Sequence, residues 1–150
     1  SLAKFDMTVD NPQAHDDEIE SGAGRYSSGT FCGPLYDASL KAIEWYESIG
    51  IDRIDKRVKE LSLYTQNMLR SLSKDIEVLS PIEEVSRGGQ TTFRFKNKDN
   101  AKFITMLINT IRLRYVNEAN LDAIRVSTHY YNSEKEIDQL KSSIENYLKG

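Results

Sequence analysis

The spacing of apolar positions predicts two consecutive helices over residues 35–72. Apolar side chains recur there at steps of three and four, which is typical of amphipathic helices. Gly50 supplies the left-handed residue that ends the first helix, and we expect Asp52 to cap the second. The apolar positions are Ala38, Ala42, Ile43, Trp45, Tyr46 and Ile49 in the first helix, and Ile54, Val58, Leu61, Thr65, Met68, Leu69 and Leu72 in the second.

The pattern changes to that of strands after residue 75. Residues 76–79, closed by Pro81, form a short predicted strand, and a turn at residues 87–89 precedes a second one. The second strand alternates apolar and polar positions, with one face formed by Thr91, Phe93 and Phe95.

Two further strands, at residues 111–116 and 124–127, follow a helix that we expect Asn100 to cap. Its predicted inward residues are Phe103, Met106, Leu107 and Ile108. The last helix begins at Ser133, which forms a predicted capping box with Glu136. It buries Ile137, Leu140, Ile144 and Leu148.

The resulting order, α-α-β-β-α-β-β-α, predicts an α+β fold in which helices cover a small, mostly antiparallel sheet. Residues 1–24 contain Asp, Asn, Pro and Gly with little apolar periodicity, so we interpret them as an extended leader or interdomain segment. The predicted domain then spans residues 25–150.

Charge and composition narrow the classes of function. The 150 residues carry 20 basic and 23 acidic side chains, a net charge of -3, so no basic field for nucleic acid is present. No apolar run approaches the roughly 20 residues of a membrane span, so we expect no membrane partner. A single cysteine, Cys32, gives no disulfide framework and fits a cytoplasmic location. We expect this thiol to be a small buried hydrophobe.

Arg125 is the first candidate binding residue. It lies in the β-branched run that precedes the last helix, where rigid backbone would hold its planar guanidinium for a carboxylate. The alternative is a surface arginine that pairs with Glu118 or Asp122.

Residues Ser28, Gly29 and Thr30 are the second candidate, because small hydroxyls and glycine ahead of a helix can bind phosphate oxygens. The segment lacks the Lys-Ser/Thr ending of a P-loop and is otherwise a plain loop. His15 and His129 are far apart in the sequence, and we predict no metal site.

Three segments together resemble class V aminotransferases, which include cysteine desulfurases, kynureninase-like enzymes and isopenicillin epimerase-like enzymes. They are Arg-Tyr-Ser-Ser-Gly-Thr at residues 25–30, Glu-Trp-Tyr-Glu-Ser-Ile-Gly-Ile-Asp-Arg-Ile at residues 44–54, and Ile-Arg-Val-Ser with the following turn at residues 124–138. The resemblance covers the chain from Arg25 to Leu148 but only the C-terminal part of the family pattern. It implies the C-terminal small domain of the aspartate aminotransferase fold.

The family resemblance also assigns roles. It implies that Arg125 binds the α-carboxylate of an amino-acid substrate. It further implies that Thr30, with Gly29 and Ser28, contacts the phosphate of pyridoxal 5′-phosphate across the interface of a homodimer.

The cofactor-binding lysine of the family precedes the Gly-Thr element, and Lys4 is the only lysine before Thr30. Lys4 has no strand around it, so we reject it for this role. We therefore predict a catalytically inactive fragment with no catalytic residue and no bound cofactor, whose partner is a missing N-terminal cofactor-binding domain. The loop at residues 115–122 contains no cysteine, which disfavours desulfurase activity.

Two alternatives remain open on the sequence. One is a stand-alone interaction or RNA-binding module that exposes Phe93, Phe95 and Arg94 on an open sheet face; helix-covered phenylalanines would favour the enzyme domain. The other is an independent anion-binding domain, which needs Thr30 and Arg125 to converge in one pocket.

Overall fold

The computed structural model describes residues 32–150. The chain divides into two compact units, one ending at Tyr46 and the other spanning Glu47–Gly150. Ser28, Gly29 and Thr30 lie outside the described residues, as do the predicted leader and Lys4.

Helix α1 spans Gly33–Ile49, as its periodicity predicts. None of its residues is buried, and large apolar side chains such as Leu40, Ile43 and Trp45 are exposed. The periodicity therefore predicts the helix correctly, although among the described residues none of its apolar side chains is buried. Cys32 is exposed too, so its predicted burial is wrong.

Helix α2 spans Ile51–Leu72. Gly50 precedes it with a φ of 98°, a left-handed conformation that suits glycine, and it occupies the N-cap position. Asp52 lies in the first turn instead, so the prediction that it caps the helix is wrong. The C-terminal two thirds of α2 carry its buried residues, which are Leu61, Ser62, Thr65, Gln66, Met68 and Leu69.

Four strands form one antiparallel sheet in the order β1-β2-β4-β3. The strands are β1 (Ile76–Val78), β2 (Gln90–Phe95), β3 (Arg114–Val116) and β4 (Ala123–Ser127). Strand β3 is shorter than predicted, because residues 111–113 leave the pairing with β4. Two short 3-10 turns lie at Glu84–Ser86 and Glu118–Asn120.

Helix α3 spans Asn100–Leu107 and helix α4 spans Glu134–Lys149. Asp99, rather than Asn100, caps α3 by accepting a hydrogen bond from the backbone N–H of Lys102. The predicted capping box of α4 is confirmed, since the backbone N–H of Ser133 donates to Glu136 at 2.7 Å.

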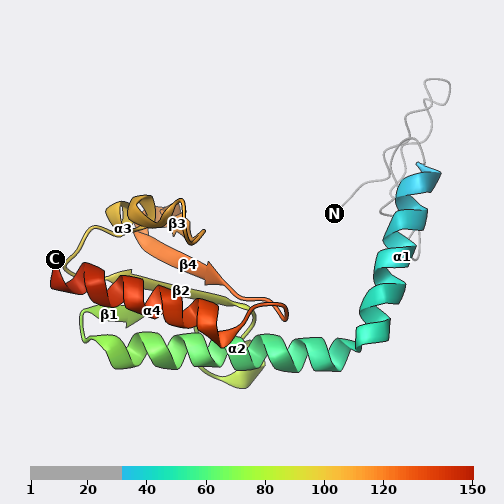
Figure 1. Cartoon of the computed structure of the whole chain (residues 1–150), viewed down its shortest axis with the longest axis horizontal. Coiled ribbons are helices and arrows are strands. Elements are labelled where there is room, and N and C mark those ends of the chain that lie inside the picture. The colour runs from blue at the N-terminus through green and yellow to red at the C-terminus, as the bar shows by residue number, and fades with distance from the viewer. Residues whose placement is uncertain (1–31) are drawn as a thin grey trace, which may run out of the picture. The chain divides into compact units, whose positions relative to one another are not determined.

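Helices α2 and α4 lie against each other and across one face of the sheet (Figure 1). That face is apolar, because Thr91, Phe93 and Phe95 alternate inward along β2 as predicted. Phe93 is 0% exposed and Phe95 is 2% exposed, so the helices cover both phenylalanines, as expected for the enzyme domain. An RNA-binding module would need these rings exposed for stacking on bases, so their burial disfavours that alternative.

An aromatic cluster links α3 and α4 to this core. The ring of Phe95 lies 5.2 Å from that of Phe103 and 5.3 Å from that of Tyr147, within the range of favourable aromatic pairs. Met106 and Ile108 were predicted inward, but they are 59% and 61% exposed, because α3 turns only one narrow face toward the sheet.

An ion pair between Arg57 and Glu134 joins α2 to the start of α4, with 2.7 Å between Nη1 and Oε1. Arg57 also donates to the carbonyl oxygen of Asn132. These contacts fix the turn that follows β4 against α2. The hydrogen bond from Arg57 holds the pKa of Glu134 at about 2, below its ordinary 4.5.

We expect Glu134→Gln to lower the thermal midpoint at neutral pH and to have no effect near pH 2. A carboxylate with a depressed folded-state pKa stabilises the fold above its unfolded pKa, and this contribution is lost as pH falls from about 4.5 toward about 2. Thermal unfolding of both proteins across that range measures it. Glu145→Gln, on the same helix, is the control, and a constant difference between Glu134→Gln and the wild type at every pH would contradict the prediction.

Candidate functional site

Arg125 is the third of the five residues of β4, a strand with partners on both sides. Its cross-strand partners are Thr92 on β2 and Arg114 on β3. Since Phe93 and Ile124 face the helices, the alternation of the pleat directs Arg125 to the opposite face. The Arg125 side chain therefore projects from a central strand, on the face opposite to the helix-covered one.

The Arg125 side chain is half-buried, and its Nε is buried without a hydrogen-bond partner. Within residues 32–150, no carboxylate lies at ion-pair distance from it. The two predicted partners are engaged elsewhere: Glu118 pairs with Arg114 at 3.2 Å, and Asp122 accepts a hydrogen bond from Tyr115 at 2.8 Å. A buried donor without a partner is costly, so this geometry favours an external anion.

The loop between β3 and β4 has an unusual backbone. Ala119, Asn120 and Asp122 have positive φ values of 55°, 59° and 45°. Asn and Asp tolerate this conformation, but for Ala119 it costs roughly 1–2 kcal/mol, so other contacts must hold this loop. The buried amide of Asn100 does so by donating to the backbone carbonyl oxygen of Asp122 at 3.2 Å and to its carboxylate at 3.1 Å.

Glu118 lies beside Arg114, with 3.2 Å between its Oε1 and Nη2 of the arginine. Its own backbone N–H lowers the pKa of its carboxyl below the ordinary value, and the hydrogen bond from Arg114 and the charges of Arg114 and Arg125 lower it further. The carboxylate is therefore ionised at neutral pH and lies within the field of both arginines.

The turn after β4 is closed by backbone contacts. Thr128 donates from its backbone N–H to the carbonyl oxygen of Gly89 at 2.7 Å, and His129 donates from its backbone N–H to the Asn132 side chain. The His129 ring lies 4.7 Å from the ring of Tyr131, and its Nδ1 is buried without a partner. This histidine thus packs within the turn.

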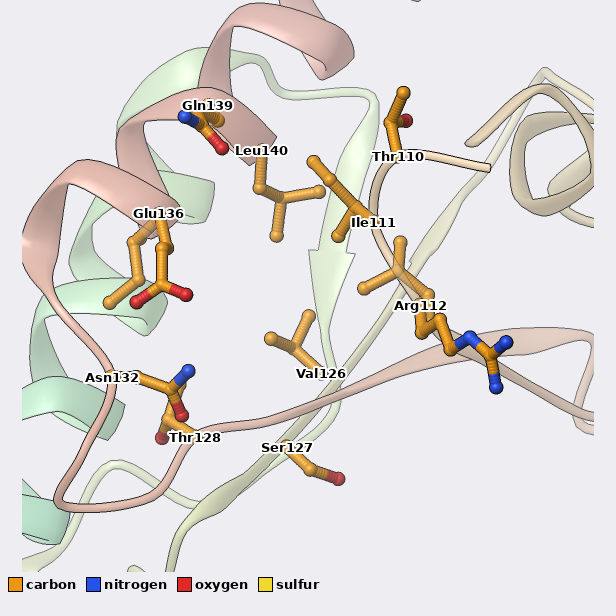
Figure 2. A pocket seen from close by; sticks show the side chains of 12 residues that line it. Thr110, Ile111, Arg112, Val126, Ser127, Thr128, Asn132, Glu136, Gln139 and Leu140 are labelled. Atoms are coloured by element: carbon orange, nitrogen blue, oxygen red, sulfur yellow. The ribbon is translucent and has the colours of Figure 1, made fainter. Parts of the chain in front are cut away.

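A cavity of about 230 Å³ lies between α4, the end of β4 and residues 110–113. Figure 2 shows Glu136, Gln139 and Leu140 on one side and Thr110 and Ile111 on the other, with the Arg112 guanidinium pointing away. Arg125 is not among its lining residues, so the cavity and the candidate site are separate. Sequence reasoning missed it, because it forms where residues 111–113 diverge from β4.

The described residues do not fit the covalent anchor of pyridoxal phosphate. No lysine side chain in residues 32–150 is buried, and none lines the cavity. The predicted phosphate contacts, Ser28, Gly29 and Thr30, fall outside the described residues, so their phosphate contact across a dimer interface stays a prediction. The alternative of an independent anion-binding domain, in which Thr30 and Arg125 would converge in one pocket, is likewise untested.

The described part of the chain offers neither a metal centre nor a membrane-spanning helix. It contains no group of three or more His, Cys, Asp or Glu side chains arranged for a metal ion. Over the same residues, no helix has the length and apolar character that crossing a bilayer requires.

Known proteins share this fold. The chain superposes on the cystine C-S lyase C-DES, in complex with its product cysteine persulfide, with a TM-score of 0.69 and 21% identity, covering 85% of this chain and 33% of that one. The cysteine desulfurase of Thermococcus onnurineus NA1 gives a TM-score of 0.73 and 22% identity, covering 85% and 34%. Another C-DES structure carries glycine linked covalently to its PLP cofactor.

Sequence comparison agrees with the fold. Isopenicillin N epimerase of Amycolatopsis lactamdurans is 27% identical over 111 residues, which are 72% of this chain and 28% of the epimerase. The chain thus spans less than a third of that relative. The sequence model of the family Aminotransferase class-V matches residues 6–140, which is most of the chain. The chain belongs to the class-V aminotransferase family.

Proposed function

We propose that this chain is the C-terminal domain of a PLP-dependent enzyme that acts on an amino acid, and that Arg125 binds the substrate α-carboxylate. The observation that carries the proposal is the buried, unpartnered Nε of Arg125 on a central strand. A guanidinium offers a planar fork of donors that a carboxylate can accept in bidentate fashion. Strands on both sides of β4 hold the backbone that carries this fork.

The cofactor would be held mainly by protein outside this chain. Pyridoxal phosphate, when bound, supplies an electron sink for chemistry at the carbon that bears the amino group. In this proposal Thr30, with Gly29 and Ser28, contacts its phosphate across a homodimer interface, and an N-terminal domain supplies the lysine. The isolated chain is then inactive, because it binds part of the substrate without the group that reacts.

The loop at residues 117–122 bears on the reaction type. Several structural neighbours are cysteine desulfurases, and this loop contains no cysteine. Cys32 lies far from it in the sequence and is exposed on the segment that precedes α1. We therefore propose an amino-acid enzyme of this family other than a desulfurase.

We expect L-alanine to bind this chain through Arg125 and L-alanine methyl ester to bind at least about tenfold more weakly. The ester keeps the amine but lacks the charge that the guanidinium recognises, and a charged hydrogen bond contributes about 1.5–3 kcal/mol. Saturation-transfer NMR of the 150-residue chain with each ligand measures the difference.

Three variants test whether Arg125 is the group that binds the alanine carboxylate. Arg125→Gln should abolish the preference for alanine over its ester, while Arg125→Lys should keep a weaker preference, because an ammonium retains the charge without the fork. Lys141→Gln removes one exposed charge on α4 and should change nothing. Equal alanine binding by Arg125→Gln and the wild type would refute the proposed role.

A further inference from the structure

We propose that Arg114 provides a second anion-binding group beside Arg125, so that the preferred ligand is an amino acid with an acidic side chain. This inference rests on the proposed function, since it takes Arg125 as the α-carboxylate site. Arg114 would bind the distal carboxylate of the same ligand.

The sheet register places the two arginines together. Arg114 on β3 and Arg125 on β4 are directly opposite each other in an antiparallel pair. Opposite residues project from the same face, with Cβ atoms about 4.5–5.5 Å apart. Their guanidinium groups therefore belong to one surface, and a short dicarboxylate is long enough to reach both.

The charges around this pair are incompletely balanced. Like charges directly opposite in a sheet are destabilising unless an anion compensates them. Glu118 pairs with Arg114, but no carboxylate of residues 32–150 pairs with Arg125. On the same face, Arg94 already pairs with its own cross-strand partner Glu77 at 2.8 Å. The positive charge of Arg125 thus remains available to bind a ligand carboxylate.

The pair between Arg114 and Glu118 can be displaced. Its side chains are 61% and 67% exposed, and Nη2 of Arg114 lies 3.2 Å from Oε1 of Glu118. Exposed pairs of this kind contribute little to stability. A ligand carboxylate held close by through its attachment to Arg125 would compete with Glu118 at high effective concentration. Without ligand, Glu118 thus pairs with the guanidinium that the distal carboxylate of the ligand would bind.

Dicarboxylates of increasing length test this second site. Acetate, malonate, succinate and glutarate would be titrated into the 150-residue chain at constant low ionic strength, with affinities taken from NMR chemical shifts. We expect at least one dicarboxylate to bind about tenfold more tightly than acetate, as one additional charged hydrogen-bonded pair allows.

Variants separate the two sites. Arg114→Gln should remove the dicarboxylate advantage, which is measured as the ratio of dicarboxylate affinity to acetate affinity within the same variant. Glu118→Gln should increase dicarboxylate affinity several-fold, because Arg114 is then free, and Lys141→Gln is the charge control.

Two results would overturn the inference in distinguishable ways. If acetate and the dicarboxylates bind equally, or if Arg114→Gln keeps the advantage, the second site is wrong while the role of Arg125 stands. If Arg125→Gln changes neither the acetate affinity nor the dicarboxylate affinity, the proposed function fails as well, and the second site fails with it.

Discussion

Replacing Gly89 with alanine is expected to destabilise the chain by about 3 kcal/mol, at the upper end of the usual cost of overpacking. A Cβ at this position would lie 2.5 Å from the carbonyl oxygen of Thr128 and 2.9 Å from Cγ1 of Val58. The first neighbour is backbone, which cannot move aside without disturbing the end of β4. The second belongs to α2, so the clash also separates the sheet from its covering helix.

The same position closes the turn after β4. The carbonyl oxygen of Gly89 accepts hydrogen bonds from the backbone N–H of Thr128 at 2.7 Å and from its hydroxyl at 3.2 Å. A backbone shift that relieves the clash would weaken both. Urea unfolding measures the loss. Gly88→Ala is the matched control, because its Cβ meets nothing within 4 Å, and it should change stability by less than about 0.5 kcal/mol. Equal stability of the two variants would contradict this packing.

Replacing Asn100 with alanine is expected to cost about 3 kcal/mol, because it leaves buried polar groups without partners. The amide oxygen accepts from the backbone N–H of Phe95 at 2.8 Å, and the amide nitrogen donates to the carbonyl oxygen of Phe95 and to Asp122. Asn100 is 1% exposed, so water cannot replace these contacts without opening the core. The left-handed loop before β4 would lose its main anchor.

Urea unfolding also measures this loss, with Asn109→Ala as the control on an exposed turn. Asn100→Asp keeps the oxygen that Phe95 needs but brings a second carboxylate toward Asp122, so it should also destabilise, and more at neutral than at acid pH. Full stability of Asn100→Ala would mean that the loop is held in another way.

Periodicity predicts the elements of this fold because each buries a regular face. The alternation of Thr91, Phe93 and Phe95 suffices to place β2, and the capping box suffices to place the start of α4. The helix caps are harder to predict, because several short polar residues compete for one position. Asp99 caps α3, which frees the neighbouring Asn100 for the buried contacts that sequence reasoning did not foresee.

Arg125 can be found from the sequence, since one arginine in a β-branched run before a capped helix is conspicuous. Arg114 cannot, because its place beside Arg125 depends on the register of β3 and β4. The loop between these strands has positive φ at Ala119, Asn120 and Asp122, and the common turn types do not predict this backbone from the sequence. The unpartnered Nε of Arg125 is likewise visible only once Glu118 and Asp122 are seen with other partners.

The NMR signal of the Arg125 Nε–H group during a titration with acetate tests the central claim most directly. This group is buried and unpartnered in the structure, and carboxylate binding to the same guanidinium should change its environment. We predict a saturable shift of the Arg125 signal, with no comparable change at Arg70, whose guanidinium already binds Gln66 and Ser80. An Arg125 signal that stays unchanged while acetate shifts other arginines would contradict the assignment of Arg125 as the carboxylate-binding residue.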